Sequence, residues 1–163
     1  MPMPYRYDDG GREAAGYRGV VGDCVTRSIC IATGLPYKKV YGAMRRLAKF
    51  EREGDRLRGW WRSHPRKGID TNRAWFVRYM NRLGFDWVEM PVGTMLVQST
   101  FGKGTYVVSL TKHYTAVVDG VIHDAYNPSI GKKRRVYGYW LKRELLDCAT
   151  TSAVSNTKQE NAP

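Results

Sequence analysis

The chain has 163 residues, a length typical of one domain with a hydrophobic core of its own. Hydrophobic residues make up 42% and charged residues 26%, and no apolar run is as long as a transmembrane helix, which excludes a low-complexity chain and predicts no membrane partner. Lys and Arg outnumber Asp and Glu by 27 to 15, and the net charge of +12 indicates an anionic partner such as nucleic acid, an acidic protein or a cell-wall polymer. A solvated basic face is the alternative.

The N-terminal residues lack the apolar segment of a secretory signal peptide, so we expect a cytoplasmic protein. The three cysteines are Cys24, Cys30 and Cys148, which cannot complete a disulfide framework and lack the paired spacing of a zinc site. We therefore expect a reducing compartment, no metal and no cofactor.

Residues 1–22 show neither helical nor strand periodicity, which predicts an irregular N-terminal arm. The chain next predicts three amphipathic helices, bounded by residues that favour helix ends. Their expected ranges are 24–33, with Asp23 as N-cap and Gly34 at the end; 36–54, opened by Pro36 and with Phe50 on its inward face; and 72–83, with Thr71 as N-cap and Gly84 at the end.

Beyond residue 84 the hydrophobic period changes from that of a helix to that of a strand. Strands are expected at 85–90, 105–110, 114–118, 121–126 and 136–141, with short helices or turns at 95–99 and 142–148. Residues 149–163 are polar and predict a disordered tail. Helices followed by an antiparallel sheet predict an α+β domain over residues 23–148.

Cys24 occupies the first turn of the first expected helix. Backbone N–H groups are unpaired there and the helix dipole is positive, and both favour the thiolate, which is the nucleophilic form of cysteine. The same N–H groups can stabilise an oxyanion beside the sulfur. Burial as a small hydrophobe is the alternative for Cys24, and it is the expected role of Cys30 and Cys148.

A cysteine nucleophile needs a base, and the chain has three histidines. His113 begins an expected strand, whereas His123 lies within the next strand and directly precedes Asp124. His64 lies in a basic loop, where a solvated role is expected.

Three short motifs resemble those of the papain-like cysteine peptidase superfamily: Gly-Asp-Cys24 at a helix start, His113-Tyr-Thr-Ala-Val-Val at a strand start, and Asp124-Ala-Tyr-Asn-Pro after the next strand. The pattern is most similar to bacteriocin-leader-processing peptidase domains and short phage-encoded proteins, and also to cell-wall endopeptidases. The resemblance implies a helical half packed on a β-sheet half, and a catalytic triad of Cys24, His113 and Asp124. A phage-encoded protein of this kind would act in the host cytoplasm.

Many members of this superfamily carry a glutamine shortly before the cysteine, where it completes the oxyanion hole. Residues 17–23 contain neither Gln nor Asn. Arg18 and Asp23 are therefore the candidates for the oxyanion site or the cleft beside it, and backbone N–H groups are the alternative donors. A scaffold kept for binding after catalysis weakened would also explain the departure.

Between residues 35 and 68, eleven basic residues stand against three acidic ones. Trp60, Trp61 and Arg62 combine aromatic and cationic side chains, a combination that suits stacking on bases beside neutralised phosphates. Alternatively, the tryptophans cover the cleft. We expect these three residues, with Asn127, to contact substrate or another anion.

The sequence predicts a small papain-like cysteine hydrolase, most simply a peptidase that cleaves a peptide or isopeptide bond in a protein or acidic peptide. One alternative is a catalytically weak or inactive basic module that binds nucleic acid or a host protein. Transglutaminase-like acyl transfer and cell-wall amide cleavage are further alternatives.

Strand alternation predicts which residue orients His113. A two-residue turn at Asp119-Gly120 makes the flanking valines a directly opposed pair. His113 and Asp124 then share one face of the hairpin, while His123 points to the other face. We therefore expect Asp124, and not His123, to bond the His113 imidazole.

Overall fold

The structure, a computed structural model, describes residues 3–19, 22–54, 64–97, 100–131 and 134–143. Several residues singled out above lie outside the described ranges, so their expected roles stay predictions: Trp60, Trp61, Arg62, Cys148 and the polar tail 149–163. Residues 144–148 of the short helix or turn expected at 142–148 also lie outside the described ranges.

Three helices follow one another along the chain: α1 (Cys24–Thr33), α2 (Tyr37–Gly54) and α3 (Ala74–Arg82). Gly34 ends α1 in the left-handed conformation, with φ of 70°, as expected of a glycine at this position. The expectation that Phe50 lies on the inward face of α2 is wrong, because this residue is 71% exposed.

The expected cap of α3 at Thr71 is wrong. The helix begins only at residue 74, with Arg73 in the N-cap position. The Asp70 carboxylate accepts hydrogen bonds from the backbone N–H of Asn72 and from Nε of Arg73, which folds residues 70–73 into a turn before the helix. The Thr71 hydroxyl instead accepts a hydrogen bond from the Tyr114 hydroxyl at 2.9 Å.

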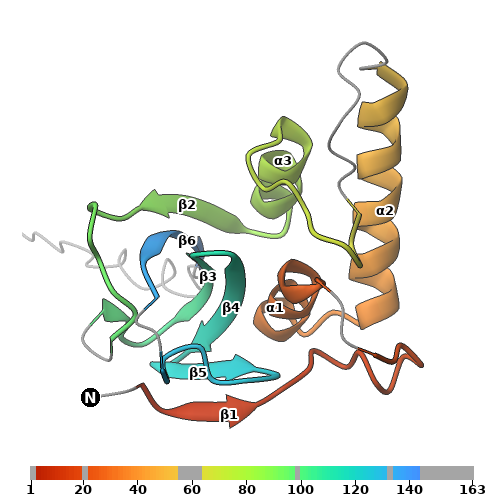
Figure 1. Ribbon diagram of the computed structural model, residues 1–163. Helices are drawn as coiled ribbons and strands as arrows, with labels where there is room; N and C mark the ends of the chain where they lie inside the picture. The colour runs from red at the N-terminus through yellow and green to blue at the C-terminus, as the bar shows by residue number, and fades with distance from the viewer. Residues whose placement is uncertain (1–2, 20–21, 55–63, 98–99, 132–133, 144–163) are drawn as a thin grey trace, which may run out of the picture.

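Six strands form one sheet in the order β1-β5-β4-β3-β6-β2 (Figure 1). Their bounds are β1 Tyr5–Tyr7, β2 Phe85–Glu89, β3 Thr105–Leu110, β4 His113–Val118, β5 Val121–Asp124 and β6 Val136–Lys142. The five C-terminal strands pair antiparallel and lie within two residues of their expected bounds. The chain is therefore α+β, as the order of elements predicted. Residues 95–97 contain an isolated bridge from Met95 to Arg135 and no helix.

The N-terminal segment corrects two expectations. Tyr5–Tyr7 is not irregular: it forms β1, which pairs parallel with β5, so the sheet is mixed and not purely antiparallel. Backbone hydrogen bonds join the two strands, from Ile122 N–H to the Pro4 carbonyl and from Asp8 N–H to the Asp124 carbonyl. A three-residue strand with every side chain exposed carries no hydrophobic alternation, so the sequence pattern could not predict it.

The hairpin between β4 and β5 has the expected register. Asp119 and Gly120 both have positive φ, 49° and 77°, as a two-residue type I′ turn requires. Val118 is paired with Val121, and the register continues inward along both strands. This register decides which side chains of β4 and β5 face the same way.

Two hydrophobic cores flank the sheet. The larger core joins the three helices to the sheet through Val107, Tyr114 and Trp140. The smaller core is made by the sheet and its loops, and contains Met3, Leu96, Phe101, Val108, Leu110, Val117, Ile122 and Val136. In Figure 1 the helices gather on one side of the curved sheet, with α1 next to β4. The N-terminus of α1 is thereby brought to the start of β4.

Candidate active site

Cys24 is the first residue of α1 and is partly exposed. The preceding residue, Asp23, occupies the N-cap position as expected, and its backbone carbonyl accepts from the Arg27 N–H. Its side chain, however, makes no capping bond to the helix. The first-turn N–H groups, which have no partners within a helix, are thus not occupied by the Asp23 carboxylate. Cys30, by contrast, is buried, and burial together with the nearby charge of Asp23 raises the pKa of its thiol to about 12.

His113 and Asp124 meet in a short, buried contact. His113 begins β4 and Asp124 ends β5, and Nε2 of the imidazole lies 2.6 Å from Oδ2 of the carboxylate. The two residues are only 6% and 2% exposed, so water competes little for this bond. The expectation that Asp124 bonds His113 is confirmed. His123 points elsewhere, with Nδ1 3.6 Å from Oδ2 of Asp8.

The imidazole also interacts with Cys24. Because Nε2 faces Asp124, Nδ1 is the ring nitrogen left for the thiol. Burial by itself lowers the pKa of His113, but hydrogen bonds to Asp124 and to Cys24, and the charges of both, outweigh burial and raise that pKa above its ordinary value. The raised pKa favours the protonated form of the His113 imidazole. The Tyr126 ring lies against the imidazole, with 4.8 Å between centroids.

Asp124 is held from two more sides. Its Oδ1 accepts hydrogen bonds from Nη1 of Arg27 at 3.0 Å and from the Ala125 N–H at 2.7 Å. Its backbone carbonyl accepts from the Tyr5 hydroxyl, in addition to the Asp8 N–H of the strand pairing. Both carboxylate oxygens are therefore engaged, which leaves the side chain little freedom to rotate away from His113.

Asp23 anchors Arg27 from behind. Its Oδ1 lies 3.0 Å from Nε of Arg27, while Oδ2 accepts from the Tyr37 hydroxyl at 2.7 Å and lies 2.8 Å from Nε of Arg12. The Arg12 guanidinium also donates to the carbonyls of Arg18 and Gly19. A chain of charged groups thus runs from the N-terminal segment through α1 to the imidazole.

Cys24 and His113 open into one cleft of about 960 Å³. Its walls come from the start of α1, residues 67–72, α3 and the sheet. Tyr114, Ser109 and Glu89 lie in one row across the sheet, since Ser109 pairs with Tyr114 and with Gly138, and Gly138 pairs with Glu89. This row belongs to β4, β3, β6 and β2, so the cleft extends from the cysteine across four strands, and its volume is that of a ligand site.

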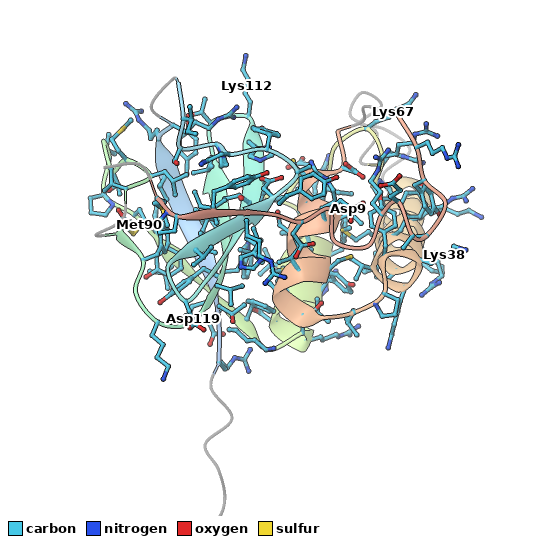
Figure 2. The ribbon with its side chains drawn as sticks, turned by 90° about the horizontal axis from the view of Figure 1, so that it is seen from below. Asp9, Lys38, Lys67, Met90, Lys112 and Asp119 are labelled. Carbon is cyan, nitrogen blue, oxygen red and sulfur yellow. The ribbon has the colours of Figure 1, made fainter. Side chains whose placement is uncertain are left out.

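The rim of the cleft is mainly basic. Lys67, Lys112 and Arg135 are exposed lining residues, and Glu89 is the acidic residue among those that line it. Figure 2 shows Lys67 and Lys112 on the same side of the molecule, the former from the helical half and the latter from the sheet half. Three residues that follow His64 in the basic loop, Lys67, Gly68 and Ile69, line the cleft.

Other expected site residues lie apart from this cleft. Arg18 and Asp23 line a separate hollow of about 410 Å³, beside Arg12 and Tyr126. The structure therefore does not bring the Arg18 or Asp23 side chain to the cleft that holds Cys24 and His113. Asn127 uses its side-chain oxygen within a turn, accepting from the backbone and the hydroxyl of Ser129.

His64 is not a freely solvated histidine. Its Nδ1 accepts from the Arg66 N–H, and its ring contacts Tyr41.

Arg27 is the residue that the sequence patterns did not single out. The one available signal was its charge, since it is the only charged residue in the ten residues of α1. A lone arginine on an otherwise apolar and small-residue helix needs a partner, but a single sequence does not name it. The sequence patterns also did not single out Arg12 and Tyr37. Each contacts Asp23 from another segment of the chain, and local patterns do not predict such contacts.

Comparison with protein-family models, curated proteins and solved structures finds no match to this chain. Within the described ranges, no helix is long and apolar enough to cross a membrane. The same ranges contain no group of three His, Cys, Asp or Glu side chains placed to hold a metal ion. Any function is therefore inferred from the geometry of the Cys24–His113–Asp124 site.

Proposed function

We propose that this protein is a papain-like cysteine hydrolase, most simply a peptidase, with Cys24 as nucleophile, His113 as general base and acid, and Asp124 as the residue that orients His113. One observation carries the proposal: a buried histidine–carboxylate pair, 2.6 Å apart, interacts through the histidine with a cysteine at a helix N-terminus. The three groups come from α1, β4 and β5, and Cys24 and His113 line one cleft.

The first half of the reaction is attack by the Cys24 thiolate on the carbonyl carbon of the scissile bond. The C–S bond forms while the carbonyl π electrons move to oxygen, giving a tetrahedral oxyanion. The imidazolium of His113 then gives its proton to the leaving amine as the C–N bond breaks, leaving an acyl-thioester on Cys24. The raised pKa of His113 supports this step, because the proton must be present to be transferred.

The second half returns the enzyme to its starting state. Neutral His113 takes a proton from water, whose oxygen attacks the thioester carbonyl. The C–S bond breaks, the carboxylic acid product leaves, and the sulfur departs as thiolate beside the newly formed imidazolium. Asp124 keeps Nε2 engaged throughout, so Nδ1 stays directed at the reacting atoms.

The N-terminus of α1 is the best-placed group to stabilise the oxyanion. The backbone N–H of Cys24 and the positive end of the helix dipole lie beside the sulfur, and the Asp23 side chain does not occupy this end of the helix. This arrangement replaces the glutamine that residues 17–23 lack, without a role for Arg18.

The cleft favours an extended acidic substrate. Three basic side chains against one acidic residue attract anionic groups, and the cleft crosses the sheet over four strands. Four strands span roughly 14 Å, about the length of four residues of extended peptide. We therefore expect a protein or peptide substrate with acidic residues within about four positions of the scissile bond.

The test of this function is the alkylation of the chain by iodoacetamide at pH 7, followed by peptide mass mapping. Cys24 should react at least about 100-fold faster than Cys30, because thiolate is the reactive form and Cys30, with a pKa of about 12, is almost fully protonated. Cys30 therefore serves as the control within the same molecule. His113→Ala should slow Cys24 labelling without changing Cys30 labelling.

Equal reactivity of Cys24 and Cys30 in the folded chain would overturn the proposal. A peptide library with a quenched fluorophore, screened with the wild-type chain and with Cys24→Ala as the inactive control, then separates hydrolysis from mere thiol reactivity.

A further inference from the structure

Arg27 is a buried cation close to the proposed catalytic groups. It lies on α1, three residues after Cys24, and is 8% exposed. Removing a guanidinium from water is costly unless opposite charges and hydrogen bonds compensate for it. The contacts of Arg27 therefore indicate why a charge stands in this otherwise uncharged helix.

The guanidinium bridges two carboxylates. Nε lies 3.0 Å from Oδ1 of Asp23, and Nη1 lies 3.0 Å from Oδ1 of Asp124. Asp23 and Asp124 are each 2% exposed as whole residues, and Asp23 is itself held by Tyr37 and Arg12. The bridge joins the helix that carries the cysteine to the strand that carries the carboxylate.

The bridge also reaches the imidazole. Asp124 presents Oδ1 to Arg27 and Oδ2 to Nε2 of His113, so the arginine and the histidine share one carboxylate. The other groups that face His113 are Cys24 from α1 and Tyr126 after β5.

Two further cations lie near this histidine without binding its carboxylate partner in the described contacts. Arg134 lies 5.7 Å from the centroid of the Tyr126 ring, and Lys112 precedes His113 in the chain. Arg27 is thus the cation that bonds the carboxylate to which His113 is joined.

We propose that Arg27 is a positioning residue of this site, which holds Asp124 toward His113 and limits how strongly Asp124 favours the protonated imidazole. The inference rests on the proposed function. Two effects combine: the hydrogen bond to Oδ1 fixes the rotation of the carboxylate, and the positive charge partly neutralises it. A histidine beside an unbalanced buried carboxylate would hold its proton too tightly to act as a base.

The test measures the pKa of His113 by NMR titration of its Cε1–H signal, in full-length chains that carry Cys24→Ser so that no thiolate contributes. Arg27→Met should raise the His113 pKa by about one unit, because it removes the positive charge that bonds the carboxylate shared with His113. Arg27→Lys keeps a charge and should bring the pKa back to within about 0.3 units of the parent chain.

A matched control is Arg73→Met, which removes an arginine–carboxylate pair of the same 3.0 Å length, to Asp70, outside this network. It should leave the His113 pKa unchanged. Asp23→Asn gives a second test of opposite sign: it removes a negative charge behind Arg27, so the His113 pKa should fall. If Arg27→Met does not fold, Arg27→Gln carries the test, because it removes the positive charge and keeps a hydrogen-bond donor; the His113 pKa should again rise.

An unchanged or lowered His113 pKa in a folded Arg27→Met chain would overturn the inference and leave Arg27 a purely structural residue. So would a rise in Asp23→Asn. These outcomes differ from failure of the proposed function, which would appear as an unreactive Cys24 in the chain that retains it, whatever the titration of His113.

Discussion

Asp124 uses both carboxylate oxygens inside the fold, one toward His113 and one toward Arg27 and the Ala125 N–H. This single side chain therefore connects an imidazole, a guanidinium and the backbone. Its neighbour His123 is as close in sequence to β4 but lies on the other face of the hairpin, near Asp8. Adjacent residues of one strand can thus have unrelated roles.

Substitution of these two neighbours gives a paired prediction. Asp124→Ala should lower the rate constant of peptide hydrolysis by about 100-fold or more, because the imidazole loses the partner that orients it. His123→Ala should leave this rate within about two-fold, since its side chain is outside the cleft lining. Initial rates on one fluorogenic peptide identified in the library screen provide the measurement.

The circular dichroism of both variants is the necessary control, because Asp124→Ala also leaves Arg27 without one partner. If a folded His123→Ala chain lost more activity than a folded Asp124→Ala chain, the assignment of the triad would be wrong.

At the scale of elements, β6 and β2 meet through a glycine. Gly138 pairs with Glu89, and the Trp87 ring lies over its Cα, where a side chain would otherwise stand. Trp87 is 41% exposed and lines the cleft, so the missing side chain shapes the distant end of the candidate substrate site.

Gly138→Ala should destabilise the chain by about 1–3 kcal/mol in urea unfolding, because the added Cβ would overlap the Trp87 ring and lie 2.7 Å from the Val88 carbonyl oxygen. Gly102→Ala is the matched control, since nothing lies within 4 Å of a Cβ at that position, and it should change stability by less than about 0.5 kcal/mol. Equal effects of the two substitutions would contradict the close packing of Trp87 on β6.

For the whole molecule, the site is where the two halves meet. Cys24 and Arg27 belong to the helical half, whereas His113 and Asp124 belong to the sheet, and both the ion pair and the histidine contact cross the boundary. Separation of the halves would break all of these contacts at once, so global stability should depend on the protonation of His113.

The sign of that dependence follows from the raised pKa of His113. A group whose pKa is higher in the folded state than in the unfolded state stabilises the fold fully below its unfolded value, about 6.5, and loses this contribution as the pH rises through the folded value. The unfolding free energy of the wild-type chain minus that of His113→Gln should therefore decrease between pH 6 and pH 9. The decrease should be about 1.4 kcal/mol for each unit by which the folded pKa is raised.

Urea titrations of both chains at several pH values provide this measurement, with His123→Gln as the control. A difference that grew with rising pH would mean that burial, and not the contacts with Asp124 and Cys24, dominates the pKa of His113.

Local patterns in the sequence determined the α+β class, the three helices, the five C-terminal strands and the turn at Asp119-Gly120, because helical period, strand alternation and turn chemistry are carried by neighbouring residues. The hairpin register then placed His113 and Asp124 on one face, since their separation is bridged by a single two-residue turn.

Only the tertiary structure decided what lies beyond such short range. Three features depend on how distant segments pack together. β1 pairs with β5, the Arg18 side chain lines a hollow separate from the cleft, and Arg27 bonds Asp124, which lies 97 positions away in the chain. Asp23 occupies the N-cap position of α1, but its carboxylate bonds the Arg27 guanidinium and the Tyr37 hydroxyl and not the N–H groups of the helix. A buried charged side chain must form ion pairs and hydrogen bonds with groups that the fold places beside it. The sequence alone does not specify which groups those are.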